Sequence, residues 1–338
     1  MTSSPSETSS DPADHTALGG SDGLAIVVAG PTASGKSRLA LALARSMDGV
    51  VINADSMQVY RDLSIMTARP TQRDSTQAPH RLYGFLDGSE LCSVARWRSR
   101  AAEEVAQVRA SGRVPILCGG TGLYIRGLLE GLAPVPDVPE AVRAMARGRL
   151  NREGPGGLYG ELALRDPSMA NRLRPTDSQR VARAWEVLTA TGRSLADWQN
   201  LPPTAPPLSG PVAVILIDPP KPDIDRAVDE RLGAMVAAGG LEEVRALLAR
   251  RLDPALPILK AVGVPEFAAV LSGEVSLAEG MARAATASRR YAKRQRTWFR
   301  NQLRHHLVVP GRWDTQLSES FWPKLDNFLH DFPLTASK

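Results

Sequence analysis

The chain has 338 residues, of which 43% are hydrophobic and 23% charged, so we expect about two globular domains with a sizeable core. The formal net charge of +5 is a mild excess of base, which permits a polyanionic partner without proving one. No apolar run is long enough to cross a membrane, and the start of the chain lacks the features of a signal peptide. The two cysteines, Cys92 and Cys118, favour free thiols in a reducing cytoplasm.

The chain opens with a segment rich in Ser, Thr, Asp and Pro, residues 1–22, which we expect to be a disordered tail. A buried strand is predicted over residues 24–29 and a helix over residues 38–47. Between them lies a complete Gly-x-x-x-x-Gly-Lys-Ser phosphate loop, made of Gly30, Pro31, Thr32, Ala33, Ser34, Gly35, Lys36 and Ser37. Its backbone N–H groups and the helix dipole favour a di- or triphosphate. Lys36 would reach the outer phosphate, and the Ser37 hydroxyl would hold Mg²⁺.

A second strand, predicted over residues 50–55, ends in the carboxylate of Asp55. On local sequence Asp55 is either a helix N-cap or a group at the same sheet edge as the phosphate loop, where it would bind Mg²⁺ or act as a base. A helix with one apolar face is predicted over residues 94–110, followed by a third strand over residues 113–118. The glycine-rich turn after it contains Thr121, which either belongs to a simple tight turn or hydrogen-bonds a leaving phosphate oxygen.

Strand, glycine turn and helix, repeated in this way, predict an α/β fold with a parallel sheet and ligands at the carboxyl ends of its strands. From residue 134 to about residue 200 the strands stop, and a helix is predicted over residues 177–191. A proline-rich linker follows over residues 201–207, and a strand returns over residues 212–217. We therefore expect a P-loop NTPase-like core in two parts, 23–136 and 204–310, with an inserted all-helical domain over 137–203. Residues 311–338 are expected to form a C-terminal tail, to which we assign no role.

The most basic segment is residues 283–304, with eight Arg or Lys and no Asp or Glu, interleaved with Tyr291, Trp298 and Phe299. A charge run is usually a solvated face, but a whole helix of one sign exceeds what solubility requires. Cations alternating with aromatic residues suit a nucleic-acid backbone. Further base in the inserted domain comes from Arg172, Arg174, Arg180 and Arg183.

Together these blocks resemble the tRNA dimethylallyltransferases. The resemblance rests on GPTASGKS at 30–37, DSMQVY at 55–60, MTARP at 66–70, PHRL at 79–82, GGTGLY at 119–124, DSQRVARAWEV at 177–187 and YAKRQRTWFR at 291–300. It runs in order over residues 24–305. It implies transfer of the dimethylallyl group of dimethylallyl diphosphate to N6 of the adenosine just 3′ of a tRNA anticodon.

The resemblance also implies roles for individual residues. Asp55 and Thr121 match the family's catalytic pair, with Asp55 as the base and Thr121, Lys36 and Mg²⁺ stabilising the leaving diphosphate. Diphosphate would be held by the phosphate loop and by Arg231. The positions that match tRNA contacts are Asp55, Ser56, Met57, Gln58, Arg143, Gln179, Arg180, Val181, Ala182 and Arg183, to which the basic segment adds Lys293, Arg294 and Arg296. A monomer would suffice to grip an anticodon stem-loop.

Two departures from the family pattern matter. Ala227 stands where the family often has Arg, so the diphosphate contact is assigned to Arg231 rather than to Arg226. Pro265 and Glu266 stand where a basic residue is usual, which puts tRNA binding by that loop in doubt. Other readings of the phosphate loop stay open. They are prenyl transfer to a free adenine nucleotide, a small-molecule kinase with an arginine-rich lid, and a nucleotide-hydrolysing switch using Asp55 or Asp218. A pure RNA-binding protein would leave the loop unexplained.

Overall fold

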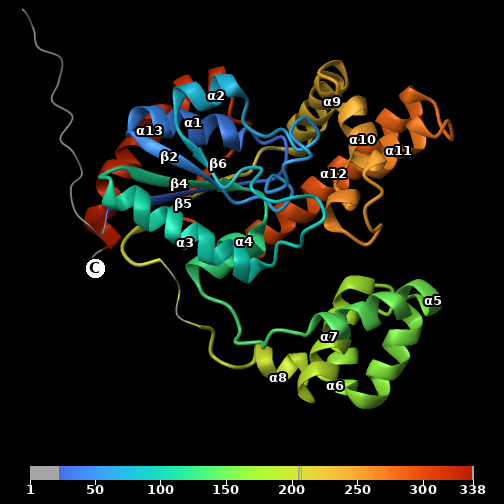
Figure 1. Ribbon diagram of the computed structural model, residues 1–338. Helices are drawn as coiled ribbons and strands as arrows, with labels where there is room; N and C mark the ends of the chain where they lie inside the picture. The colour runs from blue at the N-terminus through green and yellow to red at the C-terminus, as the bar shows by residue number, and fades with distance from the viewer. Residues whose placement is uncertain (1–22, 205, 207, 337–338) are drawn as a thin grey trace, which may run out of the picture.

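The computed structural model describes residues 23–336 apart from residues 205 and 207, so the predicted tail over 1–22 lies outside the described residues. Its centre is a sheet of six parallel strands in the order β3-β2-β4-β1-β5-β6 (Figure 1). The strands are β1 (Ala25–Ala29), β2 (Gly49–Asn53), β3 (His80–Arg81), β4 (Val114–Gly119), β5 (Val212–Ile217) and β6 (Leu307–Val309). The predicted parallel α/β fold is confirmed.

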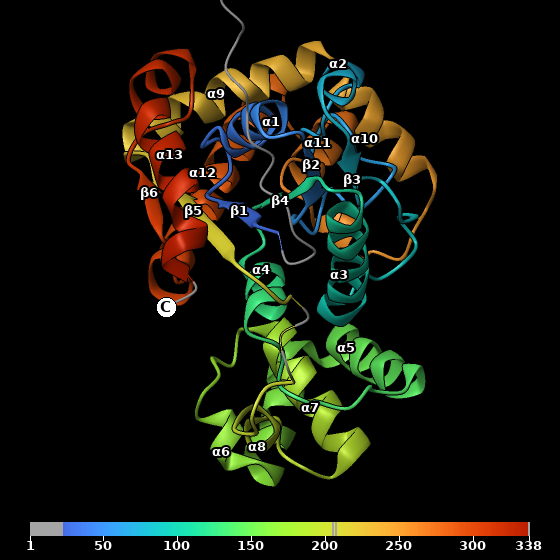
Figure 2. The same cartoon turned by 90° about the vertical axis from the view of Figure 1, so that its left-hand side faces the viewer.

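The central strands are apolar at nearly every position because both faces of the sheet are covered. Every residue of β1 is buried, and its side chains alternate between two separate cores. Val27 and Ala29 belong to the core under the helices α3 (Val94–Ala110), α4 (Gly122–Leu129) and α12 (Leu277–Gln302). Ile26 and Val28 belong to the core under α1 (Lys36–Ser46) and α13 (Thr315–Ala336), which lie together on the other face (Figure 2).

The end of the chain differs from the expected tail. After Pro310 the chain turns at Trp313 and forms α13, whose apolar residues recur every three or four positions and cover the sheet beside α1. Trp313 is buried, and its backbone N–H donates to the Ser34 carbonyl of the phosphate loop at 2.9 Å. The 11-residue α1 does not close this face alone, so α13 is part of the core.

Between β4 and β5 the described residues contain helices and no strand, as predicted for the insertion. These helices are α5 (Glu140–Arg165), α6 (Pro167–Ala170), α7 (Ser178–Thr191) and α8 (Leu195–Gln199), which form a separate group below the sheet in Figure 1. The group has its own core, in which Leu158 of α5 meets Val181 and Trp185 of α7. The chain leaves and returns at one place, because Thr204 N–H donates to the Leu132 carbonyl at 2.8 Å.

A second group of helices follows β5 and lies over the carboxyl ends of the strands. It consists of α9 (Lys221–Ala237), α10 (Gly240–Ala249), a 3₁₀ turn (Pro257–Lys260), α11 (Val264–Leu271) and the long α12. The short α2 (Gln72–Gln77) leads into β3. Among the described residues, no helix is both long and apolar enough to cross a membrane.

Candidate active site

The phosphate loop is held in the curled form that its glycines allow. Gly35 has a φ of +89° and Ala33 a φ of +65°, both in the left-handed region. A Cβ on Gly35 would lie 2.3 Å from the Trp313 carbonyl oxygen, so the loop and the segment before α13 meet backbone to backbone. The Ser34 hydroxyl is buried and has no hydrogen-bond partner among the described residues. A buried donor without a partner at the start of α1 suits a bound anion.

Two cations converge on this loop. Lys36 Nζ donates to the Pro31 carbonyl at 3.3 Å, and Arg231 of α9 donates from Nη1 to the Thr32 hydroxyl at 2.9 Å. Burial lowers the pKa of the Lys36 ammonium, Arg231 lowers it further, and the Asp55 carboxylate opposes both effects. Burial also lowers the pKa of Arg231, again opposed by Asp55. The predicted partners Lys36 and Arg231 are therefore brought together with Asp55.

Asp55 is fixed by the loop that follows β2. Its N–H donates to the side chain of the buried Asn53 at 2.9 Å, and its Oδ1 accepts from the Met57 N–H at 2.9 Å. The residues after Asp55 form turns, so Asp55 caps no helix, and the N-cap interpretation is wrong. Its second oxygen, Oδ2, lies beside Gly120, where a Cβ would come within 3.3 Å of it.

Thr121 lies next to this loop, at the start of α4. Its hydroxyl accepts from the Ser56 N–H at 2.9 Å and lies 3.2 Å from the Ser56 hydroxyl. It gives no side-chain cap to α4. The carboxyl ends of β2 and β4 thus place Asp55 and Thr121 side by side, as the parallel sheet predicts. A contact of Thr121 with a leaving phosphate oxygen remains a prediction.

A cavity of about 400 Å³ lies between the phosphate loop, Asp55 and Arg231. Thr32, Asp55 and Arg231 line its polar part, and much of the remaining wall is apolar. The residues that make this apolar wall are Met57, Met66, Val228, Leu232, Met235, Pro257, Ala261 and Val262. Tyr291 and Arg294 of α12 and Gln179 of the inserted domain also line it. A polar end for phosphates and an apolar wall suit an ester of a diphosphate with a small hydrocarbon.

The loop that carries Met66 is gripped by α10. The Glu243 carboxylate accepts from the N–H groups of Ser64, Ile65 and Met66 at 2.6, 2.9 and 2.8 Å. Gln58 donates to the Thr67 carbonyl of the same loop at 2.8 Å, and its contact with tRNA stays a prediction. Sequence reasoning missed Glu243, because nothing local to residue 243 indicates a loop almost 180 positions earlier.

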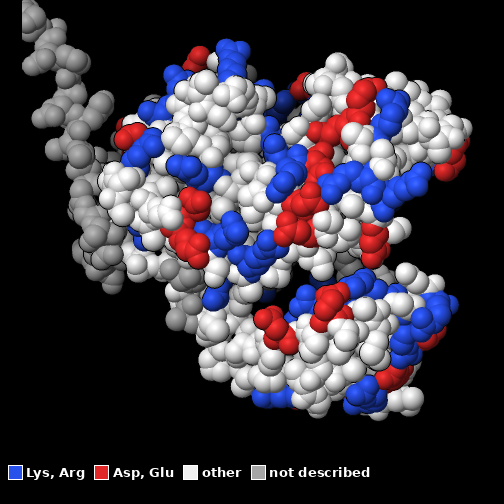
Figure 3. All heavy atoms as spheres, in the orientation of Figure 1, with Lys and Arg blue, Asp and Glu red and all other residues white. Residues whose placement is uncertain are grey.

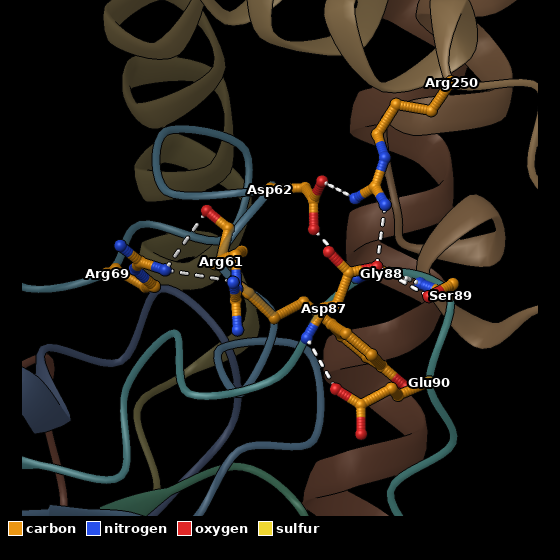
Figure 4. A network of polar contacts seen from close by, with 9 residues as sticks. Arg61, Asp62, Arg69, Asp87, Gly88, Ser89, Glu90 and Arg250 are labelled. Atoms are coloured by element: carbon orange, nitrogen blue, oxygen red, sulfur yellow. Dashed lines mark hydrogen bonds and ion pairs between the residues drawn. The ribbon is translucent and has the colours of Figure 1, made fainter.

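At the other end of α10 an arginine ties two loops together (Figure 4). Arg250 pairs with Asp62 and with Asp87, the latter at 2.7 Å, and Asp62 also accepts from the Gly88 N–H at 2.9 Å. Hydrogen bonds from Arg250 hold the pKa of the Asp87 carboxyl well below its usual range. Arg69 closes the loop by donating to the Tyr60 carbonyl at 3.0 Å. These contacts fix the backbone that runs from Asp55 to the apolar wall.

The basic segment, residues 283–304, carries only positive charges in sequence, but in the folded protein several of them lie beside acidic residues. Arg289 pairs with Asp229 at 2.6 Å, and Arg296 and Arg300 both pair with Asp218 at 2.5 Å. Arg283 pairs with Glu279 at 2.6 Å. Figure 3 accordingly shows Lys and Arg beside Asp and Glu over much of one face. The local sequence does not indicate these ion pairs, because most of the acidic partners lie on α9 or after β5. Asp218, held by two guanidinium groups, is also a poor candidate for the switch chemistry considered above.

The remaining cations of α12 include Lys293 and Arg294, which are exposed and make no ion pair with a described residue. In the inserted domain Gln179 lines the cavity and Arg180 is exposed, while Arg143 and Arg183 are partly exposed. The side chains of Val181 and Ala182 are buried in the domain's own core.

Pro265 and Glu266, which stand where the family usually has a basic residue, lie in the first turn of α11. The Glu266 carboxylate accepts from the Gly263 N–H at 2.9 Å. Lys260, which sequence reasoning missed, supplies a cation to the cavity nearby.

Comparison with known proteins agrees with the sequence blocks. A family model described as IPP transferase matches residues 58–302. A tRNA dimethylallyltransferase of Rhodospirillum rubrum is 59% identical over 312 residues, covering 92% of this chain and 96% of that protein. The full-length tRNA isopentenylpyrophosphate transferase of Bacillus halodurans is similar in structure, with a TM-score of 0.66 and 30% identity over 94% of this chain and 98% of that one.

A eukaryotic dimethylallyltransferase, solved in a crystallographic study of its action on tRNA, matches with a TM-score of 0.73 and 26% identity. That match covers 92% of this chain and 80% of the eukaryotic one. The family model covers most of the chain, and relatives align over nearly all of it. The chain therefore belongs to the tRNA dimethylallyltransferase family of IPP transferases.

Proposed function

We propose that this prenyltransferase moves the dimethylallyl group of dimethylallyl diphosphate to N6 of the adenosine 3′-adjacent to the anticodon of tRNAs. The products are N6-isopentenyladenosine and diphosphate. The observation that carries the proposal is the cavity, in which the phosphate loop, Arg231 and Asp55 meet an apolar wall. Family membership supports the same reaction.

The diphosphate end of the donor would lie on the phosphate loop. Thr32 and Arg231 line the cavity here, and the loop also carries Lys36 and the unpaired Ser34 hydroxyl. A bound diphosphate would supply negative charge to Lys36, whose pKa is lowered mainly by burial and further by Arg231. The same groups would stabilise the negative charge that develops as the allylic C–O bond breaks.

Mg²⁺ fits this arrangement as a partner of the substrate. No group of three or more His, Cys, Asp or Glu in the described part of the chain forms a ready-made metal site. Mg²⁺ usually keeps several waters and binds substrate phosphates with only one or two protein groups. Ser37, an exposed residue at the start of α1, is the one whose hydroxyl would hold it. When bound, the ion would neutralise charge on the leaving diphosphate.

Asp55 would act as the base. The lone pair of an exocyclic adenine amine is delocalised into the ring, so the nitrogen needs an acceptor for its proton as the bond to carbon forms. One oxygen of Asp55 is held by the Met57 N–H, which leaves Oδ2 for this proton. In the balanced step the C–N bond forms, the C–O bond breaks, the diphosphate keeps the electron pair of that bond, and the N6 proton passes to Asp55.

The acceptor would enter from the side of α7 and α12. Gln179 and Arg294 line the cavity from these two helices, and Arg180, Lys293 and Arg143 would contact phosphates of the RNA. The target base would leave the stack of the anticodon loop to reach Asp55. We infer that a monomer suffices, because both helices belong to one chain.

The test incubates the protein and Mg²⁺ with radiolabelled dimethylallyl diphosphate, offering an adenosine-run anticodon stem-loop and free AMP in parallel. We expect label in the stem-loop alone. Label in AMP alone would keep the chemistry of Asp55 and remove the RNA. Tight ATP binding without any transfer would instead favour the kinase alternative.

In the same assay Asp55→Asn should lower turnover about a hundredfold or more with little loss of stem-loop affinity.

A further inference from the structure

A buried glutamine on α12 joins two loops of the candidate site. Gln295 is 6% exposed. Its Oε1 accepts from the Thr32 N–H at 2.8 Å, and its Nε2 donates to the Gly120 carbonyl at 2.8 Å. Thr32 belongs to the phosphate loop, and Gly120 comes directly before Thr121. Because the two functions lie on one planar amide, the position of each loop is linked to that of the other.

We propose that Gln295 is a positioning residue for the transfer reaction, an inference that rests on the proposed function. It sets the distance between the phosphate loop, which holds the leaving group, and the loops that carry Asp55 and Thr121, of which Asp55 faces the acceptor. Reacting groups must be placed within a fraction of an ångström, so the loss of this link lowers turnover although Gln295 does not line the cavity.

The surroundings leave the amide little freedom. A Cβ on Gly120 would lie 2.2 Å from Gln295 Nε2 and 3.3 Å from Asp55 Oδ2, so the amide and the carboxylate lie on either side of that glycine. On α12 the next residue, Arg296, is bound to Asp218 at 2.5 Å, and Phe299 one turn later is fully buried. The contacts of Arg296 and Phe299 therefore fix this turn of α12 and, with it, the Gln295 side chain.

The chemistry of the position calls for a neutral amide. Methionine has a similar length but leaves the Thr32 N–H and the Gly120 carbonyl without partners. Glutamate still accepts from Thr32 but does not donate to Gly120. Gln302 offers a matched control, since it lies near the end of the same helix, is exposed, and contacts Arg126 at 3.2 Å.

The experiment measures transfer of label from dimethylallyl diphosphate to the adenosine-run stem-loop at saturating concentrations of both. We expect Gln295→Met to lower kcat at least about tenfold, while the stem-loop Kd stays within about threefold and Gln302→Met stays within about twofold of wild type. A Gln295→Met enzyme that keeps the wild-type kcat overturns the proposal. If this variant is unfolded at the assay temperature, Gln295→Glu decides, with an expected kcat loss of about fivefold or more and a normal kcat as the contrary result.

A further readout separates this inference from the proposed function. If the wild-type protein transfers no label, the proposed function fails. The link is then tested by calorimetry with inorganic diphosphate, whose affinity Gln295→Met should lower and which an unlinked Gln295 would leave unchanged.

Discussion

At the scale of single residues, the phosphate loop places the Lys36 ammonium where its surroundings disfavour the charged form. Lys36 is partly buried, faces Arg231, and has Asp55 as its nearby countercharge. A folded protein tolerates such a group where a ligand supplies the missing charge, so function here is expected to cost stability.

Lys36→Met should therefore raise the free energy of unfolding at pH 7. A lowered pKa means that the fold disfavours the charged form. That cost is present at neutral pH and disappears as pH rises through the lowered pKa toward 10.5, the ordinary value. The gain of the variant over wild type should thus shrink at alkaline pH. Urea unfolding at several pH values measures this.

Inorganic diphosphate provides the second half of that test. At a hundred times its Kd it should stabilise the wild-type protein by about 2.7 kcal/mol, and the Lys36→Met variant by almost nothing. The control is Arg38→Met, which removes an exposed cation two positions later. A variant less stable than wild type without ligand would show that Lys36 is structurally favourable, contrary to this account.

At the scale of elements, α12 combines three tasks that its sequence presents as one run of charge. Phe299 and its neighbours bury one face in the core, Gln295 bonds two loops, and Arg289 and Arg296 pair with acids of other elements. Only cations without an acidic partner gain the full binding free energy of a phosphate contact, because a paired cation would first lose its existing ion pair.

The charge pairs give a direct comparison on this one helix. Changing Lys293 and Arg294 to Gln should weaken stem-loop binding and reduce the slope of log K against log salt by about 1 to 2, since each removes a phosphate contact. Changing the ion-paired Arg283 and Arg289 to Gln removes the same formal charge and should alter the slope much less. Equal slopes for the two variants would mean that net charge, and not the free cations, determines RNA affinity.

At the scale of the whole molecule, the helical insertion is joined to the sheet domain at a single place. The Thr204 N–H bonds the Leu132 carbonyl at 2.8 Å, so the two connections run side by side. The inserted domain has its own core, and Gln179 is its contribution to the cavity lining. We propose on this basis that the phosphate site belongs to the sheet domain and that the insertion contributes to RNA binding.

Replacing residues 137–203 by a short Gly-Ser linker tests this division. Because the ends of the insertion are already adjacent, the sheet domain should fold and bind inorganic diphosphate within about threefold of wild type. Stem-loop affinity should fall at least about tenfold, since Gln179, Arg180 and Arg143 are removed. Calorimetry and filter binding measure the two affinities. A folded variant that no longer binds diphosphate would show that the insertion also shapes the phosphate site.

The sequence by itself determined the parallel α/β fold and the phosphate loop. Both follow from local rules, because apolar runs form buried strands and parallel strands bring the loops at their carboxyl ends to one edge. Local sequence left the roles of Asp55 and Thr121 open, and the family resemblance paired them. The family blocks determined the reaction class in the same way. Short stretches carried the signal in each case.

Only the tertiary structure decided contacts between distant parts of the chain. The bonds of Gln295 to Thr32 and of Glu243 to the loop at Ser64 span 263 and 179 positions, and no local pattern specifies such pairs. The pairing of Arg296 with Asp218 and the packing of α13 against the sheet belong to the same class. A side chain's partner depends on which elements the fold brings together, and that is a property of the whole chain.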